Sequence, residues 1–106
     1  MMRLIVIAVI SMAMLVGSMY AGAPEGKVVF AGKCQACHGP NGEGKAAIAK
    51  MFNVTMHPLG SKEIQAKSDA EMKKTVTEGH GKMKPVTGLD EKQVADVIAF
   101  VRTLKE

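Results

Sequence analysis

The clearest repeat of apolar and polar positions lies at the C-terminal end of the chain. Apolar residues recur there every three or four positions, at Val94, Val97, Ile98, Val101 and Leu104. This spacing places them on one face of an α-helix. The preceding Asp90-Glu91-Lys92-Gln93 has an N-capping aspartate with a glutamine three residues later, which is typical of a helix start. We therefore predict an amphipathic helix from about Asp90 to the C-terminus.

Three further segments have helical character. Residues 24–38 begin with Pro24 and Glu25, which suit a first helical turn, and an apolar surface on this helix would contain Val28, Val29, Phe30 and Ala36. Residues 46–52 form a short predicted helix. Residues 68–78 open with the capping sequence Ser68-Asp69-Ala70-Glu71 and end at Gly79.

Long loops separate these helices. The segment Gly39-Pro40-Asn41-Gly42-Glu43-Gly44 is too rich in Gly and Pro for a helix or a strand. Residues 53–60 and 83–88 are predicted to be irregular, and no segment alternates with the two-residue period of a strand. The predicted fold class is all-α, with three to four short helices joined by long loops.

The N-terminal end has the features of an export signal. Met1-Met2-Arg3 is a short positive region, and the 20 residues from Leu4 to Ala23 carry no charge. Ala21-Gly22-Ala23 has the small-x-small pattern of signal cleavage. Cleavage after Ala23 would place Pro24 at the disfavoured first position, whereas cleavage after Ala21 would place Met19 three residues upstream.

These features divide the chain into a signal peptide, residues 1–23, and a domain, residues 24–106. An uncleaved membrane anchor is the alternative, because 20 uncharged residues can just span a bilayer. In both cases the domain is exported. We predict a periplasmic protein, or a domain held at the inner membrane and facing the periplasm.

Composition limits what the exported domain can be. Its 83 residues contain only three aromatic side chains, Phe30, Phe52 and Phe100, and the two cysteines lie three positions apart. A domain of this size has a small hydrophobic core, and one close pair of cysteines cannot build a disulfide framework. This excludes a multidomain enzyme and suggests a core completed by something other than side chains.

The net charge of the chain is +4, and its lysines are scattered without a run of like charges. Scattered lysines do not predict nucleic-acid binding. A mildly basic surface favours an acidic protein partner.

The motif Cys34-Gln35-Ala36-Cys37-His38 carries the chemistry of the chain. On a helix, residues three and four apart share a face, so both thiols can reach the vinyl groups along one haem edge. The following His38 then lies beneath the iron. The spacing C-x-x-C-H is the attachment signature of c-type haem.

Two other uses of C-x-x-C stay open. A thioredoxin-like redox site requires a βαβ context, and no predicted strand precedes Cys34. A zinc site requires four ligands, for which the candidates would be Cys34, Cys37, His57 and His80.

Residues 26–39, which contain this motif, resemble the N-terminal helix of class I cytochromes c, including a small residue at Gly26 and an aromatic at Phe30. Gly79-His80-Gly81-Lys82-Met83-Lys84-Pro85 resembles the family's methionine-ligand loop, and residues 97–104 resemble its C-terminal helix. The three motifs occur in the family's order and cover nearly all of residues 24–106. The resemblance implies one haem c per chain.

The resemblance also implies the axial ligands of the haem iron. His38 would be the proximal ligand and Met83 the distal one. The family often has Met-Pro where this chain has Met83-Lys84-Pro85, and His80 is the main rival to Met83. The other candidates have simpler explanations: Met72 on a buried helix face, Met51 and Met56 as apolar filler around the porphyrin, and His57 as an exposed turn residue.

Six-coordinate iron with a neutral thioether ligand suits single-electron transfer between redox proteins rather than catalysis. We therefore predict an electron carrier and not an enzyme. Lys33, Lys82 and Lys84 adjoin the motifs that would border the haem edge. The alternatives are a haem enzyme or gas-binding domain with an open sixth position, and an electron-transfer subunit of a larger oxidoreductase.

Covalent attachment is directly testable. Extraction with acidified acetone should leave haem on the chain, because thioethers from Cys34 and Cys37 survive denaturation. Cys34→Ala should lose most of the attached haem, measured by absorbance of the precipitated protein. Haem that leaves the wild-type chain in the solvent would disprove a c-type site.

Overall fold

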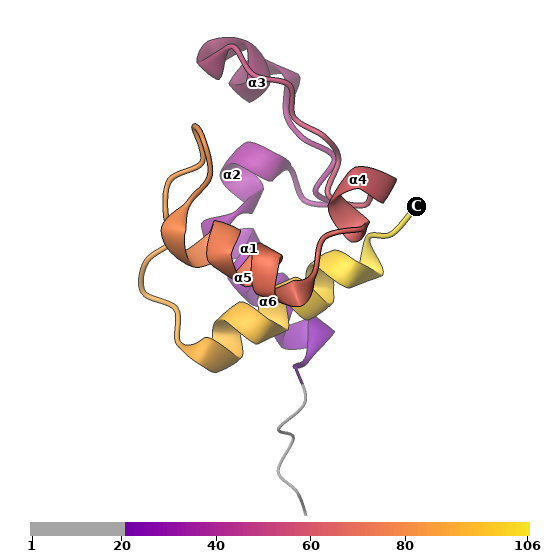
Figure 1. The fold of residues 1–106 in the computed structure, drawn as a ribbon, viewed down its shortest axis with the longest axis vertical. Helices are drawn as coiled ribbons and strands as arrows, with labels where there is room; N and C mark the ends of the chain where they lie inside the picture. The colour runs from indigo at the N-terminus through magenta and orange to yellow at the C-terminus, as the bar shows by residue number, and fades with distance from the viewer. Residues whose placement is uncertain (1–20) are drawn as a thin grey trace, which may run out of the picture.

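A computed structural model describes residues 21–106, so residues 1–20 of the predicted signal peptide lie outside the described residues. The described part folds into helices joined by loops (Figure 1). It contains no strand, and the prediction of an all-α fold is confirmed. The six helices are α1 Ala23–Lys33, α2 Gln35–His38, α3 Ala46–Phe52, α4 Lys62–Gln65, α5 Asp69–Glu78 and α6 Glu91–Thr103.

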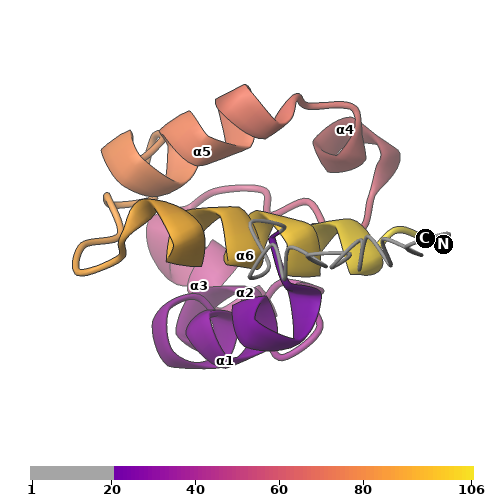
Figure 2. The same ribbon diagram turned by 90° about the horizontal axis from the view of Figure 1, so that it is seen from below.

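The two ends of the domain meet where α1 crosses α6 (Figure 2). Gly26 of α1 is buried against the backbone of Asp96 and Val97 in α6, and a Cβ at Gly26 would collide with the Asp96 carbonyl. One turn later, Phe30 packs on Phe100, with ring centroids 5.1 Å apart and planes tilted by 54°. Gly26 therefore permits the close approach that brings the two rings together.

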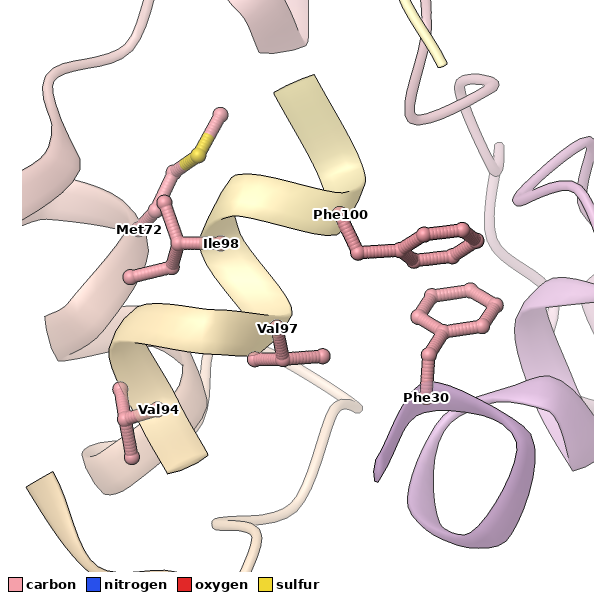
Figure 3. Close-up of a cluster of buried hydrophobic side chains, with 6 residues drawn as sticks. All are labelled: Phe30, Met72, Val94, Val97, Ile98 and Phe100. Carbon is pink, nitrogen blue, oxygen red and sulfur yellow. The ribbon is translucent and has the colours of Figure 1, made fainter. Parts of the chain in front are cut away.

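The hydrophobic core is small and follows α6 (Figure 3). Four of its residues lie on α6, one on α1 and one on α5: Val94, Val97, Ile98, Phe100, Phe30 and Met72. The predicted apolar face of the C-terminal helix is thus confirmed for its central positions. In Figure 2, α6 lies between α1 and α5, so both of these helices pack on the same amphipathic helix.

The predicted caps of α5 and α6 are present. The Ser68 hydroxyl accepts a hydrogen bond from the Glu71 backbone N–H at 3.1 Å. Asp90 accepts from the Gln93 backbone at 2.8 Å, and the Gln93 side chain accepts from the Asp90 backbone at 3.0 Å. These bonds satisfy N–H groups that a helix start leaves without partners.

The first predicted helix, residues 24–38, is in fact two helices. It begins one residue earlier, at Ala23, and is interrupted at Cys34, where φ is −118° and ψ is −33°. Helical backbone hydrogen bonding resumes where the His38 N–H donates to the Cys34 carbonyl at 3.0 Å. Gly32, a poor helix former, lies just before this break.

The prediction of a continuous apolar surface on this segment was also wrong at two positions. Val28 is 74 % exposed and Ala36 is exposed. Gly26 and Phe30 are four residues apart and share the face that meets α6, so Val28, midway between them, points away from that face.

Sequence patterns did not predict α4, which is a single turn. Its stability comes from contacts with α6. The Gln65 side chain donates to the Val101 carbonyl at 3.0 Å, and Arg102 donates to the Gln65 carbonyl at 2.8 Å. A one-turn helix is too short to show periodicity, so tertiary hydrogen bonds decide its formation.

The remaining predicted segments agree with the structure. Residues 46–52 form α3, which ends where Asn53 adopts a left-handed conformation, with φ 51°. In Figure 1, α3 stands apart from the other helices, at the end of the loops that follow α2 and precede α4.

Among residues 21–106, no helix combines the length and the apolar character that crossing a membrane requires.

The crossing of α1 and α6 predicts opposite effects for two glycines of the same helix. Gly26→Ala should lower the free energy of unfolding of the haem-loaded protein by about 1–3 kcal/mol, because the new methyl group has no room against α6. Gly32→Ala should raise it by about 0.5–1 kcal/mol, because its Cβ points into open space and alanine favours helix. Guanidinium unfolding measures both free energies, and equal effects would contradict the close approach of α1 and α6 at Gly26.

Candidate haem-binding site

The C-x-x-C-H motif occupies the turn between α1 and α2. The Cys34 N–H donates to the Phe30 carbonyl at 2.8 Å, so the first cysteine extends the helix that α6 holds. The Cys34 carbonyl accepts hydrogen bonds from the N–H groups of Cys37, at 3.2 Å, and His38, at 3.0 Å. These hydrogen bonds form one helical turn that contains Cys34, Cys37 and His38, the three residues that carry the chemistry of the motif.

The two thiols lie at the surface of this turn and are not joined in a disulfide. Cys34 is half-buried and Cys37 is exposed. Burial, and to a smaller extent the neighbouring Cys37, raises the pKa of the Cys34 thiol above its usual value. A raised pKa keeps the thiol protonated, whereas cysteines that act in redox exchange have lowered values. The local environment thus differs from that of a thioredoxin-like site.

His38 is held as a neutral imidazole. Burial lowers its pKa below the usual value, and its Nδ1 atom is buried without a hydrogen-bond partner. The backbone fixes the residue further, since the His38 carbonyl accepts from the Gly44 N–H at 2.7 Å. Neutral imidazole is the form that binds metals, so this environment suits a metal-binding histidine.

Met83 lies in a tight turn that begins at the end of α5. His80 and Met83 exchange two backbone hydrogen bonds, each 2.9 Å long. At the entry to the turn, the Gly79 N–H donates to Thr75, and beyond it the Val86 N–H donates to Val76 at 2.8 Å. The loop is therefore tied to α5 on both sides of Met83.

Exposure separates the candidate distal ligands. Met83 is half-buried, whereas His80 and His57 are exposed, as predicted for His57. Met72 is only 7 % exposed and belongs to the core, which confirms its predicted structural role. Met51 is 67 % exposed and Met56 half-buried, so their packing around a porphyrin stays a prediction.

The candidate zinc ligands are not brought together. Within residues 21–106, no group of three or more His, Cys, Asp and Glu side chains is arranged to hold a metal ion. In the same part of the chain, no strand precedes Cys34, so the βαβ context of a thioredoxin-like site is missing too.

Sequence reasoning missed the way in which Gly79 shapes the methionine loop. Gly79 has φ 80° and ψ 173°, a conformation that is open essentially to glycine alone. A Cβ at this position would meet the Met83 carbonyl oxygen and the ring of Pro85. The sequence signal for this shape is the pair Gly79 and Pro85, although Gly79 by itself indicates only a helix stop and Pro85 only a loop.

The described domain is small and all-α, and its first helix, which packs closely on the last, leads into the C-x-x-C-H turn. The sequence model of the family described as cytochrome c matches residues 23–105. The chain therefore belongs to the cytochrome c family. This membership implies covalently bound haem c and electron transfer through it.

Solved structures share the fold. The KustC0563 c-type cytochrome is similar with a TM-score of 0.66 and 24% identity, over 76% of this chain and 98% of the other. Cytochrome cL from Hyphomicrobium denitrificans gives a TM-score of 0.61 and 24% identity, over 79% of this chain and 48% of the other. A search of curated proteins gave no match.

The residues present fit the haem that the family implies. Attachment requires two thiols and a histidine in one turn, and Cys34, Cys37 and His38 provide them with a neutral imidazole. The small core of the described domain is also consistent with a fold that closes around an apolar cofactor.

The methionine loop predicts unequal effects for two glycines. Gly79→Ala should destabilise the haem-loaded protein by more than the roughly 1–3 kcal/mol that a non-glycine residue costs in this backbone region, because its methyl group would also meet Met83 and Pro85. Gly81→Ala is the matched control, since Gly81 also has a positive φ, 55°, but faces open space. Denaturant unfolding measures both variants, and an equal loss would show that Gly79 does not shape the loop.

Proposed function

We propose that this protein is an exported monohaem cytochrome c that carries single electrons between redox proteins through a haem iron ligated by His38 and Met83. The observation that supports this most strongly is the helical turn of Cys34, Cys37 and His38 at the end of α1, in a chain whose family match spans residues 23–105. When bound, the haem supplies an iron that alternates between the ferric and ferrous states.

The residues of the attachment turn have separate roles in this proposal. The Cys34 and Cys37 thiols would each add S–H across the C=C bond of one haem vinyl group, and the two thioethers would hold the cofactor at the turn between α1 and α2. His38 gives its Nε2 atom to the iron, and burial of the ring keeps it free of the competing proton. A second ligand from outside this turn then completes the iron coordination.

Met83 is the better candidate for that second ligand. It is half-buried in a turn tied to α5 on both sides, whereas the rival His80 is exposed. A thioether is soft and neutral, so it favours ferrous iron and a higher reduction potential than a second imidazole. Occupation of both axial positions leaves no place for oxygen or peroxide, which supports a carrier rather than an enzyme.

The proposed partners are redox proteins with acidic docking surfaces, met in the periplasm. Lys33 is the last residue of α1, directly before Cys34, and Lys82 and Lys84 flank Met83; all three are exposed. The Lys33 ammonium lies beside Gly88, in the segment that follows the methionine turn. Basic side chains thus border both ligand-bearing segments. Complementary charge speeds the encounter of transient electron-transfer partners.

Replacement of Met83 tests the ligand assignment. Met83→Ala should shift the ferric iron towards high spin, lower the reduction potential and give weak peroxidase activity, because water and peroxide gain access to the metal. Optical and electron paramagnetic resonance spectra with a redox titration measure these changes.

His80→Ala is the control for the same experiment and should retain the low-spin spectrum. Loss of that spectrum in His80→Ala, with Met83→Ala unchanged, would replace the His/Met pair by a low-potential His/His pair.

A further inference from the structure

Asp96 is a buried carboxylate that the proposed electron transfer does not use. Its side chain is 3 % exposed, on the face of α6 that α1 crosses. One carboxylate oxygen, Oδ2, accepts from the Lys92 ammonium at 2.8 Å. The other, Oδ1, accepts from the backbone nitrogen of Gly22 at 2.7 Å. These bonds, that from Lys92 above all, lower the pKa of Asp96 below its usual value.

Gly22 belongs to the folded domain, although it precedes the predicted boundary at Pro24. It is the N-cap of α1, and its carbonyl accepts the Gly26 N–H at 2.9 Å. Cleavage of the signal peptide after Ala23 would remove this acceptor and the donor to Asp96 Oδ1. A buried carboxylate oxygen without its donor is unfavourable.

The surroundings of the Gly22 nitrogen are acidic. A Cβ built on Gly22 would meet the carboxylate of Glu25, so that group lies against Gly22. Asp96, Glu25 and Asp90 all raise the pKa of Lys92, so three carboxylates lie near this ammonium. A positive charge at the Gly22 nitrogen would offset more of this negative charge. An ammonium at that nitrogen would have three N–H groups and could donate to more acceptors than one backbone amide.

We propose that signal peptidase cleaves between Ala21 and Gly22, and that the new α-ammonium of Gly22 forms an ion pair with buried Asp96. The reaction is hydrolysis: one water molecule adds across the peptide bond, Ala21 leaves with a carboxylate, and Gly22 gains an amino group that takes up a proton. Cleavage at this bond would have the small residue Ala21 directly before it. It would also keep Pro24 away from the disfavoured first position of the mature chain. The inference rests on the proposed export.

The N-terminus of the exported, haem-loaded protein tests the cleavage site. The full chain is expressed in a bacterium that matures c-type cytochromes, and the periplasmic product is examined by intact mass and N-terminal sequencing. A chain that begins at Gly22 supports the proposal. A chain that begins at Pro24 or elsewhere, or that keeps its leader, overturns it.

The same sample separates this inference from the proposed function. Haem retained under denaturing conditions on a chain with another N-terminus would overturn the cleavage site alone. A chain that begins at Gly22 but holds no haem would support the cleavage site and overturn the proposed cytochrome function.

The pH dependence of stability tests the ion pair. A carboxylate partner raises the pKa of the Gly22 ammonium above the usual value of about 8, so its stabilising effect is complete below that pH and is lost as the pH rises through the raised pKa. Asp96→Asn should therefore lower the unfolding midpoint more at pH 7 than at pH 10. Glu63→Gln, at an exposed position of α4, is the control for loss of a carboxylate. An Asp96→Asn effect that does not change with pH would overturn the pair.

Discussion

The contact on which the rest of the fold depends is the close crossing of α1 and α6 at Gly26. Because Gly26 has no side chain, the backbone of α1 reaches that of α6, and Phe30 can then pack on Phe100. The haem motif begins four residues after Phe30, with Cys34 hydrogen-bonded to the Phe30 carbonyl. The crossing therefore fixes the position of the attachment turn relative to α6.

The small core links the fold to the cofactor. Six buried apolar residues gather along α6, while Met51, Phe52 and Val54, on and just after α3, stay partly or largely exposed. A flat apolar cofactor attached at α2 would give the domain additional apolar surface to bury in the native state, which would add to its stability. In the proposed function, the same covalent group would serve both electron transfer and folding.

The sequence predicted the parts of the structure that depend on local signals. The caps at Ser68 and Asp90, the helix at residues 46–52 and the buried position of Met72 follow from residue type and spacing. It did not predict the break at Cys34, the single turn of α4, or the exposure of Val28. The last two of these features depend on tertiary contacts: α4 needs the Gln65 and Arg102 hydrogen bonds, and only the packing on α6 decides which face of α1 is buried. At the site, the spacing identified Cys34, Cys37 and His38, whereas the glycine-dependent shape of the Met83 loop became visible only in three dimensions.

In the proposed function, the chain itself fills both axial positions of a covalently held haem. Addition of carbon monoxide to the ferrous, exported protein tests this most directly, because the gas binds readily only where an axial position is open. We expect a low-spin spectrum that carbon monoxide leaves unchanged at neutral pH, together with a reversible one-electron redox titration. Rapid and complete formation of a carbon monoxide complex would contradict it and would favour a haem enzyme or gas-binding domain.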